Sequence, residues 1–158
     1  MFIDKAVIKI KAGDGGNGAV SFRREKYVSA GGPDGGDGGR GGSVIFRVDE
    51  GSNTLLAFRY KRKFVATNGG DGAGAKFHGK NGEDLLIKVP LGTIVSDTET
   101  GEFICDIYYD GQKRLVMKGG HGGKGNARFT TSRRHCPHFA QKGEKTEIKR
   151  ISLELKVI

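Results

Sequence analysis

Features that mark several other protein classes are missing from this chain of 158 residues. The two cysteines, Cys105 and Cys136, are too few and too far apart for a disulfide framework, so we expect both thiols to be reduced. No apolar stretch approaches the roughly 20 residues of a membrane-spanning helix. The start of the chain also lacks the basic-then-apolar order of a signal peptide. We therefore expect a cytoplasmic protein without a membrane span.

Acidic residues are scarce where basic residues gather. The chain has 27 Lys and Arg against 18 Asp and Glu, and no acidic residue occurs between Gly111 and Gly143. Two further basic clusters, residues 23–27 and 59–64, include aromatic residues. Cations attract phosphates and aromatic rings stack on bases, so this composition favours an RNA partner. The alternative is a basic surface that serves only solubility.

Glycine is far more frequent than usual, at 28 residues. The run from Gly32 to Ser43 reads GPD-GGD-GGR-GGS, and its period of three is the repeat of polyproline II. Shorter runs occur at residues 13–18, 69–74 and 119–125. A single run of this kind is typical of a flexible linker. Several runs between strand-like segments favour an ordered bundle, in which a residue without a side chain occurs at each contact between chains.

The segments between the glycine runs predict an all-β fold, a small barrel or sandwich carrying a glycine-rich lobe of packed polyproline II helices. Alternating or β-branched patterns predict strands at residues 2–12, 44–48, 85–90, 93–96, 103–108, 114–117 and 151–157. We expect 103–108 and 114–117 to form a hairpin through a turn at Asp110-Gly111. Cys105 is then in phase with Phe103 and Ile107, which predicts a core position. The one short helix is expected at 53–58, capped by Ser52 or Asn53.

Motifs for nucleotides, metals and catalysis fail when their context is tested. G-x-G-x-x-G occurs at residues 13–18 and 36–41, but no amphipathic helix follows, so we expect no dinucleotide fold. Lys124 follows two glycines as in a P-loop, but the loop's first glycine and its Ser or Thr are missing. His135, Cys136 and His138 could begin a zinc site, which is the less favoured alternative because zinc takes about four ligands. We predict that this chain holds no cofactor or metal and is not itself an enzyme.

Long stretches of the sequence resemble the N-terminal domain of the Obg family of ribosome-associated GTPases. They are residues 12–18, 22–27, 31–39, 87–90, 118–120, 125–129 and 153–157, and the resemblance spans essentially the whole chain. It implies one domain, residues 1–158, with a glycine-rich lobe at about 13–42, 66–84 and 119–146 on a small β-barrel. It also implies that a GTP-binding domain follows Ile158, and that GTP and Mg²⁺ belong to that domain.

The family's role implies that this chain binds ribosomal RNA during assembly of the large subunit, within a protein that also acts in stress and growth control. Its loop tips would enter the peptidyl-transferase region; here they are residues 23–27, 76–80 and 128–142. Residues 132–139 are unusually basic and His-rich, and 143–146 depart from the usual Gly-Glu-Pro-Gly.

The residues expected to bind RNA are Arg23, Arg24, Lys26, Tyr27, Lys61, Arg62, Lys76, Lys80, Arg128, Arg133, Arg134, His135 and Lys142. The expected partners are the large ribosomal subunit and the attached GTPase domain, and we expect a monomer. The alternative function is a regulatory protein-interaction module that restrains the GTPase domain.

Overall fold

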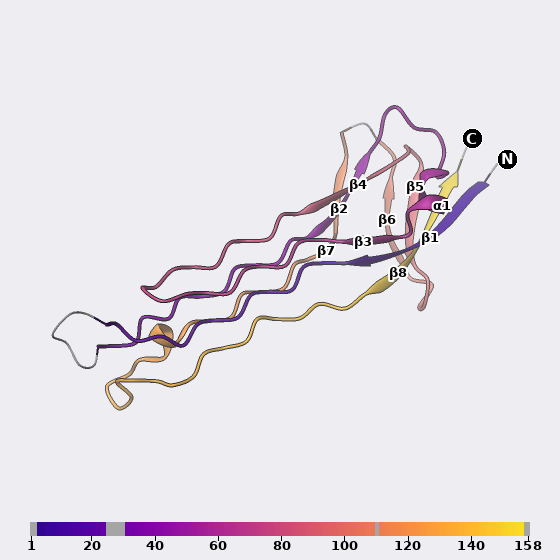
Figure 1. Ribbon diagram of the computed structural model, residues 1–158. Helices are drawn as coiled ribbons and strands as arrows, with labels where there is room; N and C mark the ends of the chain where they lie inside the picture. The colour runs from indigo at the N-terminus through magenta and orange to yellow at the C-terminus, as the bar shows by residue number, and fades with distance from the viewer. Residues whose placement is uncertain (1–2, 25–30, 110, 157–158) are drawn as a thin grey trace.

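The molecule is elongated, with two β-sheets at one end and a long bundle of extended chain at the other (Figure 1). The structure, a computed structural model, describes residues 3–24, 31–109 and 111–156. Lys26 and Tyr27, two of the residues expected to bind RNA, lie outside the described residues. The fold is therefore all-β at its base, as the strand patterns predict, and the glycine runs project from it.

Two separate sheets make up the base, so the sandwich rather than the closed barrel is observed. The five-stranded sheet has the order β3 (Lys63–Val65), β1 (Ile3–Lys11), β8 (Lys149–Lys156), β5 (Thr93–Asp97), β6 (Phe103–Ile107). The three-stranded sheet has the order β4 (Leu85–Val89), β2 (Val44–Val48), β7 (Lys113–Met117). β1 pairs with β3, and β2 with β4, in parallel; the other pairs are antiparallel.

One hydrophobic core lies between the two sheets. Alternation along the strands supplies it: Ile8 and Ile10 of β1 and Leu153 of β8 are buried, whereas Lys5 and Lys9 of β1 are exposed. Phe46 of β2, which is fully buried, contributes to the same cluster from the other sheet. The period-two pattern of the sequence thus places apolar residues inward and lysines outward, as predicted.

The predicted hairpin at Asp110-Gly111 is wrong, because β6 and β7 belong to different sheets. The buried side chain of Gln112 fills the place of the missing partner strand. Its Oε1 accepts hydrogen bonds from the N–H groups of Tyr108 at 2.8 Å and Tyr109 at 3.3 Å. Its Nε2 donates to the carbonyl oxygen of Asp106 at 2.9 Å. These bonds satisfy backbone groups that a hairpin would have paired, and the chain crosses to β2.

The helix α1 (Ala57–Tyr60) begins later than the predicted 53–58, and neither predicted cap residue caps it. The cause is the buried carboxylate of Asp4 on β1. It accepts hydrogen bonds from the hydroxyl of Thr54 at 2.8 Å and the N–H of Leu55 at 2.6 Å. These bonds hold residues 54–55 outside the helix, and they also keep the pKa of Asp4 below its usual range, against the opposing effect of burial.

The predicted position of Phe103 is also wrong, although Cys105 and Ile107 are buried as expected. Cys105 pairs with Val95, but Phe103 pairs with Ser96, so β6 carries one extra residue between the two pairs. Such a bulge reverses the side on which the next residue lies, and Phe103 is 59% exposed. Burial raises the pKa of the Cys105 thiol, which fits a core residue rather than a nucleophile.

Extended runs project from the sheets, and we call them the glycine lobe: residues 12–22, 31–43, 66–73, 77–84, 118–126 and 140–147 (Figure 1). Hydrogen bonds join neighbouring runs at every third residue. Between the first two runs, the N–H groups of Gly13, Gly16 and Ala19 donate to the carbonyl oxygens of Gly42, Gly39 and Gly36 at 2.8–2.9 Å. The period of three seen in the sequence is therefore the period of contacts between packed chains.

Glycine is required in the lobe for space and not for an unusual backbone angle. Among the described glycines, φ is positive only at Gly92, Gly101 and Gly111, none of which is in the lobe. A Cβ on Gly38 would collide with the carbonyl group of Gly16 in the neighbouring run. The same collision recurs along the lobe with backbone atoms of other runs. Any side chain at these positions would push two backbones apart.

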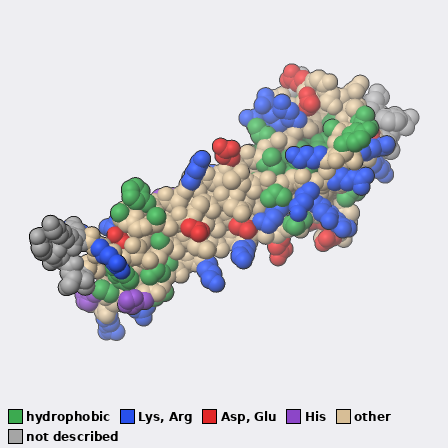
Figure 2. All heavy atoms as spheres, viewed as in Figure 1, with side chains coloured by type: hydrophobic (Ala, Val, Ile, Leu, Met, Phe, Trp, Pro, Cys, Tyr) green, Lys and Arg blue, Asp and Glu red, His purple; other side chains and the backbone are tan. Residues whose placement is uncertain are grey.

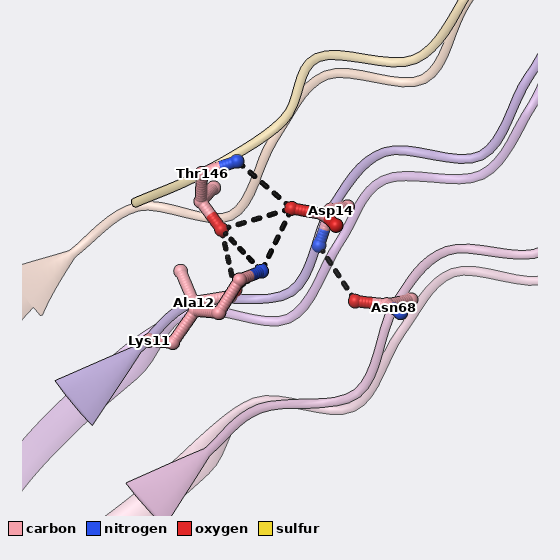
Figure 3. A network of polar contacts seen from close by, with 5 residues as sticks. All are labelled: Lys11, Ala12, Asp14, Asn68 and Thr146. Carbon is pink, nitrogen blue, oxygen red and sulfur yellow. Dashed lines mark hydrogen bonds and ion pairs between the residues drawn. The ribbon is translucent and has the colours of Figure 1, made fainter. Parts of the chain in front are cut away.

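The third residue of many triplets is Asp or Asn, and its side chain binds the backbone of a neighbouring run. The N–H groups of Asp14, Asn17, Arg40 and Ser43 donate to the side-chain oxygens of Asn68, Asp71, Asn81 and Asp84, respectively, at 2.8–3.0 Å. Figure 3 shows one such position, where Asp14 lies between three runs. Its Oδ1 accepts from Nζ of Lys11 and from the N–H of Thr146, both at 2.8 Å. These two bonds, that of Lys11 foremost, keep the pKa of Asp14 below its usual range.

Candidate nucleic-acid interface

The end of the glycine lobe that lies farthest from the sheets carries basic, hydrophobic and His side chains (Figure 2). We call the described residues there, 21–24, 31–35, 73–78 and 126–139, the lobe tip. Arg23 and Arg24 are exposed in its first segment, which is held by an isolated β-bridge between Phe22 and Pro33. Lys76 belongs to the segment 73–78, and Arg128, Arg133, Arg134 and His135 belong to the segment 126–139. All five of these side chains are exposed.

An open groove of about 370 Å³ lies on the lobe tip. It is lined by Lys76, His78, Arg128, Asp37 and neighbouring glycine backbone. Arg128 already has a partner there: its Nη2 and Nε lie 2.8 and 3.0 Å from Oδ2 of Asp37. Burial raises the pKa of Asp37, but hydrogen bonds from Gly125 and Arg128 outweigh it and leave this pKa below its usual range. The ion pair with Asp37 therefore fixes Arg128 in the wall of the groove. Lys76 has no such ion pair among the described residues, so its ammonium group is more available to a ligand.

The segment at 74–77 is a tight turn with an unusual backbone. Ala75 and Lys76 have φ values of 57° and 59°, in the left-handed region, where non-glycine residues are uncommon. Asp34 holds the turn, because its carbonyl oxygen and carboxylate accept the N–H groups of Lys76 and Ala75 at 2.6 and 3.1 Å. Phe77 follows the turn and is 68% exposed. Left-handed residues of this kind cluster at functional sites, and here they present a cation and an aromatic ring together.

Asn126, a fully buried residue at the start of the 3₁₀ helix η1 (Asn126–Phe129), joins three segments of the lobe tip. Its Oδ1 accepts the N–H of Gly35 at 2.8 Å. Its Nδ2 donates to the carbonyl oxygens of Ser21 at 3.0 Å and Pro137 at 3.1 Å. Nothing in the sequence marks Asn126, because a lone asparagine after a glycine run looks like any surface residue. It positions the basic segments without facing solvent.

Aromatic contacts organise the segment 126–139 of the lobe tip. Phe129 and Phe139 have ring centroids 4.9 Å apart, and the guanidinium of Arg134 lies 5.1 Å from the Phe139 ring. His138 packs against Phe22 of the first segment, with ring centroids 5.0 Å apart. Across the described part of the chain, no three His, Cys, Asp or Glu residues are placed to hold a metal ion. The histidine-rich loop thus has a packing role that the sequence alone did not indicate.

Four of the residues expected to bind RNA lie away from the lobe tip. Lys80 and Lys142 are on the shaft of the lobe, where the carbonyl of Lys80 accepts the N–H of Gly70 and Lys142 lines a groove with Lys124. Lys61 and Arg62 are at the sheet end, between α1 and β3. Figure 2 shows Lys and Arg side chains at both ends of the molecule and several along its middle. The predicted set therefore divides between the lobe tip, the shaft and the sheet end.

Comparison with known proteins identifies the family of this chain. The family model described as GTP1/OBG matches residues 3–157. The chain is 59% identical to the GTPase Obg of Persephonella marina over 99% of its length, and 56% identical to that of Staphylococcus aureus over 100%. This protein belongs to the GTP1/OBG family. It covers 46% and 37% of those two relatives, so it spans less than half their length.

No helix within residues 3–24, 31–109 and 111–156 has the length and apolar character needed to cross a membrane.

Proposed function

We propose that this chain is the ribosomal-RNA-docking module of an Obg-type GTPase. In this proposal the lobe tip binds RNA of the large ribosomal subunit near the peptidyl-transferase region, in the cytoplasm, and the whole protein acts in subunit assembly and in growth and stress control. The observation that carries the proposal is the convergence of three exposed basic segments at one end of a bundle of hydrogen-bonded glycine runs.

The packing of the lobe supports a role that depends on shape. A thin bundle whose runs approach one another closely at glycine can enter a narrow space, and its hydrogen bonds at every third residue fix the tip before binding. Ordering costs that flexible loops would pay on binding are thereby reduced. Lys76 and Arg133 supply charge for phosphates, and exposed Phe77 supplies a ring on which an unpaired base can stack.

The proposal assigns GTP and Mg²⁺ to another part of the longer protein. The relatives are named as GTPases, and this chain covers less than half of their length. Its glycine runs pack against one another through their backbones, and their N–H groups donate to neighbouring runs instead of pointing together at a phosphate. The role of this chain is accordingly delivery and positioning.

Binding to purified large ribosomal subunits, measured across a salt series, tests the proposal. About five phosphate contacts would give a slope of log K against log salt of roughly −3 to −4. Replacing Lys76 and Arg133 by Gln should make the slope shallower, whereas the same change at Lys88 and Lys113 on the three-stranded sheet should not. Absence of salt-sensitive binding by the wild type would refute the proposal. A change in the GTP turnover of the longer GTPase on removal of residues 1–158, measured without ribosomes, would then favour the regulatory alternative.

A further inference from the structure

Three cations lie abreast on the outer face of the five-stranded sheet. Lys9 of β1 is paired in register with Lys63 of β3 on one side and with Arg150 of β8 on the other. All three are exposed, and they lie on the face opposite the core residues Ile8 and Ile151. Because neighbouring strands are about 4.8 Å apart, the row concentrates three positive charges across three strands.

The row has no compensating charge among the described residues. Like charges directly opposite one another destabilise a sheet, yet none of the three forms an ion pair in the described part of the chain. The neighbouring Lys11 is different, because its Nζ is bound to Asp14 at 2.8 Å. Further along β1, Lys5 lies opposite Glu154. On this face of the sheet, the row at Lys9 therefore combines three cations with no ion pair among the described residues.

A basic groove continues this row toward α1. The groove, of about 440 Å³, is lined by Lys5 and Val7 of β1 together with Arg59 and Arg62. The carbonyl oxygen of Arg62 accepts the N–H of Lys9 at 2.7 Å, so groove and row are continuous. The nearby carboxylate of Asp4 is buried and already bound by Thr54 and Leu55. We call the combined surface the sheet-end basic face: Lys5, Lys9, Arg59, Arg62, Lys63 and Arg150.

We propose that the sheet-end basic face binds the phosphodiester backbone of RNA, as a second contact separate from the lobe tip. This inference rests on the proposed function, because it takes the same ribosomal RNA as its partner. Charge complementarity identifies the ligand: the face presents cations from three strands and one groove, and point charges bind phosphates without reading bases. Two copies of this face would repel each other, so self-association does not cover it.

The outer face of the three-stranded sheet carries a second row of three cations, but its surroundings differ from those of the row at Lys9. There Arg47 is paired with Lys88 and Lys113, which is again three cations abreast. That row adjoins a row of Ile45, Leu86 and Leu115, in which the two leucines are 45% and 58% exposed. Acidic residues 49 and 50 share a groove with it. The mixture of apolar, acidic and basic groups does not suit a phosphate backbone, so this row is a control matched in number, charge and strand geometry.

Two contacts at opposite ends of a packed molecule reinforce each other. Once the lobe tip is bound, the sheet-end basic face is held near the same RNA at a high effective concentration. Loss of either contact should therefore weaken binding strongly without abolishing it. The salt slope should change by an amount set by the number of phosphates lost, about 0.7 for each contact to a single strand.

Three variants of equal charge test the proposal in the salt-series assay with large ribosomal subunits. The sheet-end variant is K9Q/K63Q/R150Q, the tip variant is R24Q/K76Q/R133Q, and the control is R47Q/K88Q/K113Q. We expect the sheet-end variant to lose about 10-fold or more in affinity and to flatten the slope by about 2, with the control near wild type. Thermal unfolding should show no loss of stability in the sheet-end variant, because removing opposed like charges relieves repulsion.

The possible outcomes separate this proposal from the function on which it rests. Failure of the wild-type protein to bind large ribosomal subunits would refute the proposed function itself. A tip variant that loses affinity while the sheet-end variant matches the control would overturn only the second contact. Lost affinity with an unchanged salt slope would point to a protein contact at this face and would equally overturn the assignment to RNA.

Discussion

Replacing Gly38 by alanine is the sharpest test of the packing of the glycine lobe. At most sites where a glycine has ordinary φ, alanine stabilises a protein by about 0.4–1 kcal/mol, because the unfolded chain loses freedom. Gly38 has no positive φ, so the backbone angle itself permits alanine. Its Cβ, however, would meet the carbonyl group of Gly16 and the N–H of Asn17, which are backbone atoms of the adjacent run. Neither can move without separating the runs.

The cost follows from the bonds around that contact. Overpacking a close-packed interior costs typically 1–3 kcal/mol. Separation of the runs also threatens the bonds from Gly16 to Gly39 at 2.9 Å and from Gly123 to Gly16 at 2.8 Å. Each buried group left without a partner costs about 1–3 kcal/mol. We therefore expect G38A to lose about 3–6 kcal/mol, a large part of the 5–15 kcal/mol that stabilises a typical domain.

Gly32 provides the matched control in the same run. A Cβ at Gly32 meets nothing within 4 Å, and its φ is also not positive. Both substitutions restrict the unfolded chain equally, so their difference reports the folded state alone. Urea unfolding followed by circular dichroism, with amide hydrogen exchange to separate lobe from sheets, measures both. If G38A comes within about 1 kcal/mol of G32A, the runs do not nest as described.

Three further changes test other parts of the argument. Replacing Asn126 by alanine removes the partner of the Gly35 N–H and of the Pro137 carbonyl, whereas the Ser21 carbonyl keeps the N–H of Asp34 at 2.9 Å. We expect a loss of about 1–3 kcal/mol with faster hydrogen exchange confined to the tip; unchanged exchange there would contradict this role. Asp14 has a folded-state pKa below its reference value of 3.8, so its stabilising effect is complete above that value and is lost as pH falls through the folded pKa. The Asp14→Asn variant should thus be less stable than wild type at pH 7, by about 1–3 kcal/mol, and the difference should shrink below about pH 3.8; a pH-independent difference would argue against the ionised hydrogen bonds. Replacing Phe77 by alanine should weaken RNA binding by about 1–3 kcal/mol with the salt slope unchanged, whereas Tyr108→Ala, at a similarly exposed ring near the sheets, should have no effect.

Local patterns predicted the strands well and the connections between them poorly. Alternation identified β1 and β8 because each residue's side depends only on its own position along the strand. The turn at Gly111 does have the positive φ of 75° that its sequence indicates. The partner of β7 could not be predicted, because the choice between β6 and β2 depends on Gln112 reaching backbone groups several residues away. For the same reason the start of α1 was missed: the carboxylate that sets it comes from Asp4, about fifty residues earlier.

For the candidate site, too, local features could be predicted from the sequence and long-range contacts could not. The basic clusters and their link to the ends of glycine runs could be read from the sequence, since charge and period are local properties. The sequence could not tell that Arg128 is paired with Asp37, or that Asn126 joins three segments, because those partners are distant along the chain. The sequence named Arg62 among the residues expected to bind RNA without giving it a place in the fold, and the structure puts Arg62 at the sheet end.

The sequence by itself determined that glycine recurs every third residue and that cations cluster between the glycine runs. Periodicity and charge need no knowledge of what lies across the molecule. The tertiary structure alone decided which runs lie side by side, which cations gain an acidic partner and which stand in an uncompensated row. Those outcomes depend on contacts between residues far apart in the chain, such as Lys9 with Lys63 and Arg150, that become neighbours only when the strands pair.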